Sequence, residues 1–256
     1  MAELAHYTVE QGVATITLDS PHNRNALSAQ LRTELRHHLT AALNDDAARV
    51  VVLTHTGPVF CSGMDLKEAG TAGTADRGVT EFPAILTEIW TSPKPVVARL
   101  AGPARAGGVG IVAACDISIA ARQATFAFSE VRIGVVPAVI SVTVLPRLLP
   151  RAAHELFLTG ETFDAERAAR IGLLNSVVEA EELDGEVRRY TDMLTLGGPN
   201  ALAATKTMLR RPRTGDVDRD FADMLALSTV HFGSAEGQEG IAAFAQKRKP
   251  SWVPRR

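Results

Sequence analysis

The stretch FCSGMDL at residues 60–66 follows a short run of β-branched residues and precedes a predicted helix. The preceding run, RVVVLT at residues 49–54, is typical of a strand buried on both faces of a sheet. Gly63 permits an unusual backbone turn, and Asp65 is placed to cap the helix that follows. Backbone N–H groups in such a turn lack partners and can bind a developing negative charge, but the stretch alone fits an ordinary capped turn equally well.

A second turn of the same kind, AGGVG at residues 106–110, follows the predicted strand at residues 95–100 and opens a helix. Its adjacent glycines would let a ligand approach the backbone closely, although many such turns only permit a helix to pack tightly on a sheet. The G-x-G-x-x-G pattern of dinucleotide sites and the Gly-Lys-Ser/Thr ending of phosphate loops are both absent. The turn therefore indicates close backbone approach without identifying a nucleotide.

A third feature, FAFSEVRIGVVP at residues 126–137, surrounds Glu130 with apolar residues. A carboxyl group in such surroundings has a raised pKa, which suits it to accept and return a proton. The alternative interpretation is a surface ion pair of Glu130 with Arg132 or Arg147. From these residues alone the two interpretations are equally good.

Strand-like and helix-like patterns alternate through the first two thirds of the chain, which predicts an α/β fold. Residues 5–18 predict a hairpin that turns at Gln11-Gly12, and Ser28 is expected to cap a helix. The Gly/Thr-rich segment at residues 70–78 predicts a mobile loop. Further strands are predicted at residues 116–120 and 173–178, and further helices at residues 79–90, 107–114, 164–172, 181–196, 200–210, 216–230 and 234–246. We expect a core at residues 1–195 and a helical region at residues 196–256.

The composition favours one large domain, or one domain with a helical appendage: 256 residues, a net charge of -2 and 46% hydrophobic residues. Near-neutral charge gives no broad positive field for nucleic acid. No signal peptide is recognised, and the apolar stretch at residues 107–121 is broken by Asp116, so no membrane association is expected. Cys61 and Cys115 fit a reduced, cytoplasmic protein better than a disulfide framework. The seven histidines lack metal-ligand spacing, so no metal is expected.

Together the three features resemble the crotonase superfamily, the enoyl-CoA hydratase/isomerase family, in order and spacing. The similarity extends to PHNRNAL at residues 21–27, to LTG at residues 158–160 with the segment that follows, and to FAQKRKP at residues 244–250. It covers nearly the whole chain. The resemblance implies a spiral of ββα units with a C-terminal helical trimerisation region, and a homotrimer or a hexamer built as a dimer of trimers.

The resemblance also implies catalytic roles. Met64 and Gly107 would supply the backbone N–H groups of an oxyanion hole that holds a thioester carbonyl, and Glu130 would move protons. Two preorganised donors stabilise the enolate-like oxygen that forms in the reaction. Coenzyme A is part of the substrate in this family, so no separate cofactor is expected.

Substrate contacts are implied in the same way. Arg24 would reach a phosphate of coenzyme A, while Lys247 of a neighbouring subunit would close the nucleotide end with Phe244. The alternative for Lys247 is a solvated run of charge. The full set implied to bind the acyl-CoA substrate is Arg24, Ala26, Leu27, Ser62, Asp65, Leu66, Gly108, Pro137, Phe244 and Lys247.

One departure from the family pattern bears on the reaction. Hydratases of the family usually place two glutamates around one water, and the first of these would fall at Gly110, which has no side chain to donate or accept a proton. Three hypotheses remain: a hydratase that works with Glu130 alone, a Δ3,Δ2-enoyl-CoA isomerase with Glu130 as its sole base, and an acyl-CoA-binding protein without turnover. We expect the hydratase type.

Overall fold

The computed structural model describes residues 2–69, 74–212 and 214–254. A six-stranded sheet forms its centre, in the order β1 (Ala5–Glu10), β2 (Val13–Leu18), β3 (Val50–His55), β4 (Val96–Leu100), β6 (Ile117–Ala121) and β9 (Ser176–Val178). Only β1 and β2 are antiparallel, and the predicted hairpin at Gln11-Gly12 is confirmed, with both residues at positive φ. The parallel strands read as apolar runs because both faces of the sheet are covered.

A second, smaller sheet orders β5 (Ala104–Arg105), β7 (Thr125–Ala127) and β8 (Phe163–Asp164). None of these strands is predicted from the sequence, because two or three residues are too short to show a period of two. β5 and β7 are parallel, and each leads directly into a segment that carries one of the three sequence features. This small sheet therefore fixes how those features lie relative to one another.

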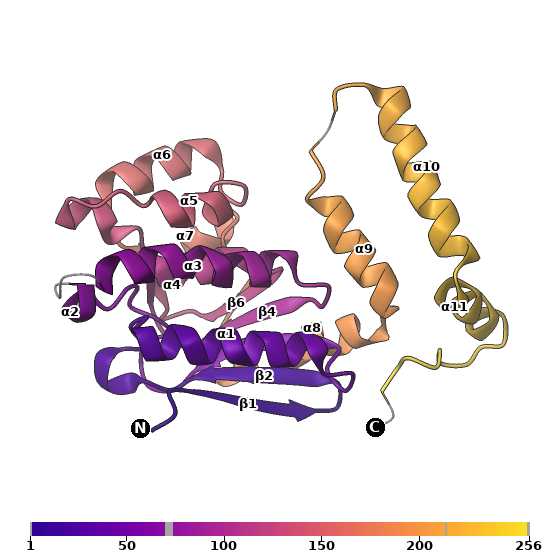
Figure 1. Cartoon of the computed structure of the whole chain (residues 1–256), viewed down its shortest axis with the longest axis horizontal. Coiled ribbons are helices and arrows are strands. Elements are labelled where there is room, and N and C mark those ends of the chain that lie inside the picture. Colours follow the sequence, from indigo (N-terminus) through magenta and orange to yellow (C-terminus); the bar gives the residue numbers. More distant parts are fainter. Residues whose placement is uncertain (1, 70–73, 213, 255–256) are drawn as a thin grey trace.

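Helices cover both faces of the large sheet (Figure 1). The predicted cap is confirmed, since the Ser28 hydroxyl accepts the N–H of Leu31 at the start of α1. The predicted loop at residues 70–78 is wrong for its second part, because α3 begins at Thr74, and residues 70–73 lie outside the described part of the chain. The helices of the core are α1 (Ala29–Asn44), α2 (Leu66–Ala69), α3 (Thr74–Thr91), α4 (Gly107–Ala114), α5 (Ala138–Val144), α6 (Pro150–Thr159), α7 (Ala165–Arg170) and α8 (Leu183–Leu196), with short 3-10 turns η1 (Pro21–Asn23), η2 (Ser129–Ile133) and η3 (Ala180–Glu182).

The last three helices, α9 (Pro199–Leu209), α10 (Val217–Gly233) and α11 (Ala235–Ala245), form an arm that projects beside the core (Figure 1). The arm is fastened through Lys206 of α9, whose Nζ lies 2.6 Å from the carboxylate of Asp116 and 3.1 Å from the carbonyl oxygen of Ile89. Burial lowers the pKa of Lys206 against the opposing effect of Asp116. α9 is thus docked on the core by a buried ion pair.

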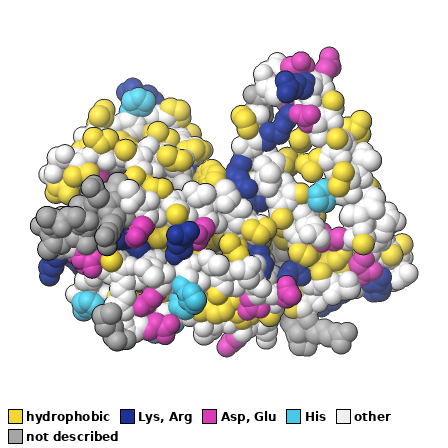
Figure 2. Space-filling model, viewed as in Figure 1, with side chains coloured by type: hydrophobic (Ala, Val, Ile, Leu, Met, Phe, Trp, Pro, Cys, Tyr) yellow, Lys and Arg dark blue, Asp and Glu magenta, His cyan; other side chains and the backbone are white. Residues whose placement is uncertain are grey.

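By contrast, α10 contains no buried residue. Figure 2 shows hydrophobic side chains gathered along the arm and over the α5–α6 end of the core. On the arm the large exposed apolar side chains include Phe221, Leu225, Val230, Phe232 and Phe244, and at the other end they include Val142, Leu145, Leu149 and Leu158. Apolar surface on this scale marks interaction sites in soluble proteins. No described helix is long and apolar enough to cross a membrane.

Candidate active site

The two glycine-containing turns lie side by side because their chains pair just before them. The N–H of Phe60 donates to the carbonyl oxygen of Pro103 at 2.9 Å, and the N–H of Arg105 donates to that of Cys61 at 2.9 Å. A Cβ built on Gly63 would lie 3.5 Å from the backbone nitrogen of Gly107. Segments forty residues apart in the numbering are thereby brought into direct contact.

Both turns leave backbone donors free. Gly63 has φ +93°, and Ala106 at the start of α4 has φ +47°, which is unusual for a residue with a side chain. The carbonyl oxygen of Ala106 accepts the third and fourth N–H groups of α4. Among the described residues, no acceptor meets the N–H of Gly107 or of Met64. Two such donors on neighbouring turns are what an oxyanion requires.

The segment that carries Glu130 is joined to the second turn by a backbone hydrogen bond. Ala106 donates its N–H to the carbonyl oxygen of Ala127 at 3.0 Å, and Glu130 follows three residues later in η2. Its Oε2 is buried and has no hydrogen-bond partner in the described part of the chain. Burial raises the pKa of the Glu130 carboxyl above its ordinary value, as the sequence predicts.

The alternative of a surface ion pair for Glu130 is wrong. Arg132 donates its Nε to the carbonyl oxygen of Thr159 at 2.7 Å. Arg147 is committed to the C-terminal end of α4, where it donates to the carbonyl oxygens of Ala113 and Cys115. Neither arginine therefore pairs with the Glu130 carboxyl, which forms no ion pair among the described residues.

The place of the missing glutamate is filled. A Cβ built on Gly110 would lie 2.6 Å from Cγ2 and 3.1 Å from Cβ of Ile140, which belongs to α5. The hydroxyl of Thr143, one turn further along α5, donates to the carbonyl oxygen of Gly110 at 3.1 Å. Absence of a side chain at residue 110 thus allows α5 to pack directly on α4, and the packing in turn excludes a side chain there.

Gly108, predicted to contact substrate, has a packing role in the structure. A Cβ at this position would lie 2.6 Å from the carbonyl oxygen of Cys61 and 2.8 Å from its Cβ. Burial raises the pKa of the Cys61 thiol to about 12, which agrees with its interpretation as a packing residue rather than a nucleophile. The close approach of Gly108 and Cys61 is what sets the two turns against each other.

We therefore expect Gly108→Ala to lower the free energy of unfolding by about 3 kcal/mol, at the upper end of the range for overpacked cores, because backbone atoms cannot move aside as a side chain can. Urea denaturation would measure the change. The matched control is Gly185→Ala in α8, where no atom lies within 4 Å of the added Cβ. There the same substitution should stabilise the protein by about 0.5–1 kcal/mol. Equal effects at the two positions would contradict this account.

The loop at residues 21–27 wraps around the first turn. The N–H of Ser62 donates to the carbonyl oxygen of Arg24 at 3.1 Å, and the exposed Arg24 has φ +60°. The side chains of Ala26 and Leu27 are buried, so their predicted contacts with coenzyme A would have to involve the backbone or a thin exposed edge. Asn25, which the sequence did not single out, holds the loop through its fully buried amide, bonded to the backbone of Ser20, Thr56 and Val59.

Asp65, Leu66 and Pro137 are three other predicted binding residues. Asp65 caps α2 by accepting the N–H of Lys67 at 3.0 Å, which confirms its expected capping position, and its second oxygen accepts the amide of Asn23. Leu66 is 61% exposed, whereas Pro137 is buried at the start of α5. Their contacts with substrate stay predictions.

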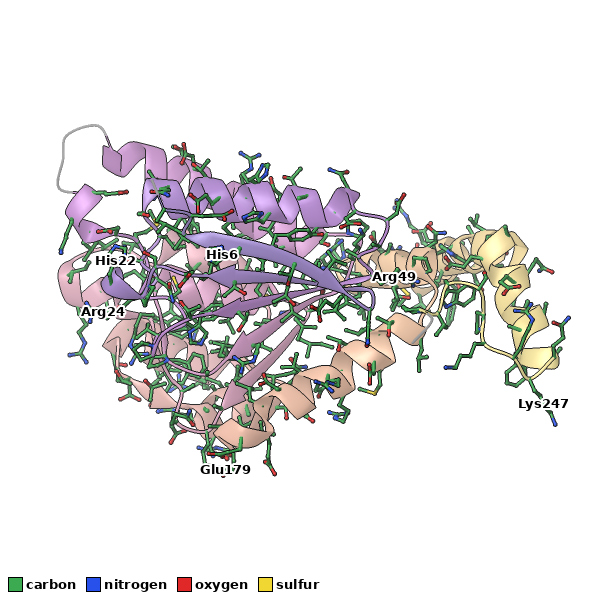
Figure 3. All side chains as sticks on the ribbon, turned by 90° about the horizontal axis from the view of Figure 1, so that it is seen from below. His6, His22, Arg24, Arg49, Glu179 and Lys247 are labelled. Carbon is green, nitrogen blue, oxygen red and sulfur yellow. The ribbon has the colours of Figure 1, made fainter. Side chains whose placement is uncertain are left out.

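Phe244 and Lys247 do not join the site within one chain. Figure 3 places Arg24 and Lys247 at opposite ends of the molecule. Phe244 is 89% exposed. Any contribution of these two residues to a coenzyme A site must therefore be made to another copy of the chain, as the sequence analysis expects.

Two residues of this region were missed. The sequence predicts a helix around Arg32 but none around Ile140, and it assigns neither residue a role, because their importance comes from contacts with distant parts of the chain. Among the described residues no group of three His, Cys, Asp or Glu side chains could hold a metal ion, and the expectation of a metal-free site stays a prediction.

The mostly parallel sheet, the two adjacent glycine-containing turns and the buried glutamate together point to a crotonase-type protein with a C-terminal helical region. The sequence model of the enoyl-CoA hydratase/isomerase family matches residues 8–255, and the chain belongs to this family of acyl-CoA enzymes. The predicted resemblance and fold are confirmed.

Relatives and solved structures agree with this assignment. The chain is 36% identical to the carnitinyl-CoA dehydratase of Citrobacter koseri, with both chains covered completely. It is 32% identical to enoyl-CoA hydratase domain-containing protein 3 of Mus musculus, over 95% of this chain and 82% of that protein. The crystal structure of an enoyl-CoA hydratase from Mycobacterium smegmatis superposes with a TM-score of 0.90 at 31% identity, over 97% of this chain and 98% of that chain.

Proposed function

We propose that the protein hydrates a 2-enoyl-CoA thioester, or dehydrates the corresponding 3-hydroxyacyl-CoA, with Glu130 as its single acid–base group. The observation that carries the proposal is the buried carboxyl of Glu130, whose pKa is raised and whose Oε2 has no partner among the described residues. Dehydratases among the relatives support a reaction that adds or removes water.

In the hydration direction, the Glu130 carboxylate takes a proton from a water molecule while the water oxygen bonds to C3 of the substrate. The electrons of the double bond move toward the thioester, whose carbonyl oxygen becomes an enolate oxyanion. The N–H groups of Met64 and Gly107 stabilise that charge. Glu130 then returns its proton to C2 as the enolate collapses, so one water has been added and the carboxylate is restored.

The contact of Ile140 with Gly110 supports a second candidate, Δ3,Δ2-enoyl-CoA isomerisation. In this reaction Glu130 removes a proton from C2 of a 3-enoyl-CoA, and the dienolate is held by the same two N–H groups. The protonated Glu130 gives the proton to C4, which leaves a 2-enoyl-CoA. No water takes part, so a site with one carboxyl and an apolar wall in place of the second is sufficient.

A paired assay separates these possibilities. The purified protein is offered a 2-enoyl-CoA and a 3-enoyl-CoA in separate reactions; hydration is followed by mass, and the double-bond shift by the ultraviolet absorbance of the conjugated enoyl thioester. We expect a 3-hydroxyacyl-CoA from the 2-enoyl substrate, heavier by one water. If the 3-enoyl substrate is converted to its conjugated isomer while the 2-enoyl substrate stays unchanged, the protein is an isomerase. Tight binding with neither conversion would favour the acyl-CoA-binding hypothesis.

We also propose that the working form is a homotrimer or a dimer of trimers. The apolar side chains exposed on the arm support this, as does the distance between Arg24 and Lys247 in one chain, because a neighbouring copy could bring Phe244 and Lys247 to the nucleotide end of the site. The two cysteines are free and buried, which supports a reducing compartment such as the cytoplasm.

A further inference from the structure

Arg32 is a buried cation in the first turn of α1, with only 4% of its side chain exposed. Its Nη1 donates to the carbonyl oxygen of Leu27 at 2.6 Å, and its Nη2 lies 3.6 Å from the carboxylate of Glu81. Its Nε is buried and meets no acceptor in the described part of the chain. A positive charge near a helix N-terminus is unfavourable, and so is a buried donor without a partner. Arg32 is therefore poorly explained as a residue that only stabilises the fold.

Leu27, which Arg32 holds, touches both halves of the proposed oxyanion hole. Its N–H donates to the carbonyl oxygen of Gly63 at 2.8 Å, directly before Met64. Its side chain is fully buried against the other turn, where Cδ1 lies 3.1 Å from the position of a Cβ on Gly107. A shift of Leu27 would therefore move the two donors relative to each other.

Glu81, the other group near Arg32, lies next to a second support of the same glycine. The ring of Phe82 on α3 is buried, and two of its carbons lie 3.4 Å from the position of a Cβ on Gly107. Arg32 thus connects α1, the loop that ends at Leu27, and α3. The loop, through Leu27, and α3, through Phe82, both pack on the turn at Gly107.

We propose that Arg32 is a positioning residue for the oxyanion hole, acting through the carbonyl group of Leu27. The proposal rests on the proposed function, because it assumes that the N–H groups of Met64 and Gly107 bind a thioester oxygen. A charge-assisted hydrogen bond is stronger and shorter than a neutral one, so the guanidinium fixes Leu27 more firmly than a neutral side chain would. Misplacement of reacting groups by about 1 Å can cost 10²-fold in rate.

The test measures carbonyl polarisation directly. A dimethylaminocinnamoyl-CoA thioester absorbs at longer wavelength when hydrogen-bond donors draw electrons toward its carbonyl oxygen. The full-length wild type is expected to shift this band when it binds the probe. Arg32→Met is expected to reduce the shift at saturation and to lower kcat about tenfold or more, with a smaller change in KM. Arg32→Lys keeps the charge and one donor, and should restore part of the shift.

Arg49→Met is the matched control. Arg49 also donates to backbone carbonyl groups, those of Gly197 and Trp252, but it lies at the end of the sheet away from Arg24 (Figure 3). This variant should lower Tm and keep the full shift of the bound probe. If Arg32→Met binds the probe with the wild-type shift, the positioning role is wrong. If Arg32→Met does not fold, Arg32→Lys and Arg32→Gln take its place, and a wild-type shift in both would likewise show that the positioning role is wrong. Absence of a shift in the wild type would instead overturn the oxyanion hole itself.

Discussion

Glu130→Gln is expected to lower kcat by about 10²- to 10⁴-fold, the range typical of a lost acid–base group, while acyl-CoA binding is kept. Glutamine has nearly the same shape and buries no charge, so the fold has no reason to change. Glu130 acts as a base only when its carboxyl is ionised. Because burial raises the pKa of Glu130, this ionised form is lost at a higher pH than for an exposed glutamate when the pH is lowered. The value of kcat/KM for the wild type should therefore begin to fall at that higher pH. Steady-state kinetics across pH would measure both effects.

The control for Glu130→Gln is Glu181→Gln, at an exposed position in η3. This variant should keep wild-type kcat. Full activity of Glu130→Gln on both a 2-enoyl-CoA and a 3-enoyl-CoA would show that another group moves the proton. If the fall of kcat/KM at low pH is unchanged in Glu130→Gln, the group that titrates there is not Glu130.

The second large effect is expected at the contact between α4 and α5. Gly110→Glu alone should destabilise the protein by about 1–3 kcal/mol or prevent folding, because its Cβ would overlap Cγ2 of Ile140. Adding Ile140→Ala removes that atom, so the double variant should be more stable than the sum of the two single changes predicts. A double-mutant cycle in urea gives this coupling directly.

The same double variant has a functional consequence. With space for a second carboxyl beside the reacting water, hydration of a 2-enoyl-CoA should rise by about tenfold or more over Ile140→Ala alone, since general acid–base groups contribute factors of this size and above. Gly110→Gln with Ile140→Ala is the matched control, because it fills the same volume without an acid. A gain of hydration in this control equal to that of the glutamate variant would mean that volume, and not proton transfer, is responsible.

A large part of the site can be predicted from the sequence. The turn at Gly63 and the turn at Gly107 are recognisable because positive φ and close backbone approach restrict the residues that a chain can use there. Glu130 stands out as a lone carboxyl among apolar residues, and the order and spacing of the other two motifs then favour a proton-transfer role over a surface ion pair. The long strands and helices follow from hydrophobic periodicity, which acts within a few neighbouring residues.

Other features depend on contacts between distant parts of the chain, and these could not be predicted. β5, β7 and β8 are too short to show a period, yet the pairing of β5 with β7 places the second turn beside the segment that leads to Glu130. Ile140 is one apolar residue among several in a segment without a predicted helix, and its role follows only from the packing of α5 on Gly110, thirty residues earlier.

The sequence by itself therefore determined the α/β class, because hydrophobic periodicity is local, and its three motifs together determined the family and with it the class of substrate. Only the tertiary structure decided that neither Arg132 nor Arg147 pairs with Glu130, that Ile140 packs on Gly110, and that Arg32 holds Leu27 between the two turns. The physical reason is that burial, overlap and charge pairing depend on distances in space, which chain order does not specify.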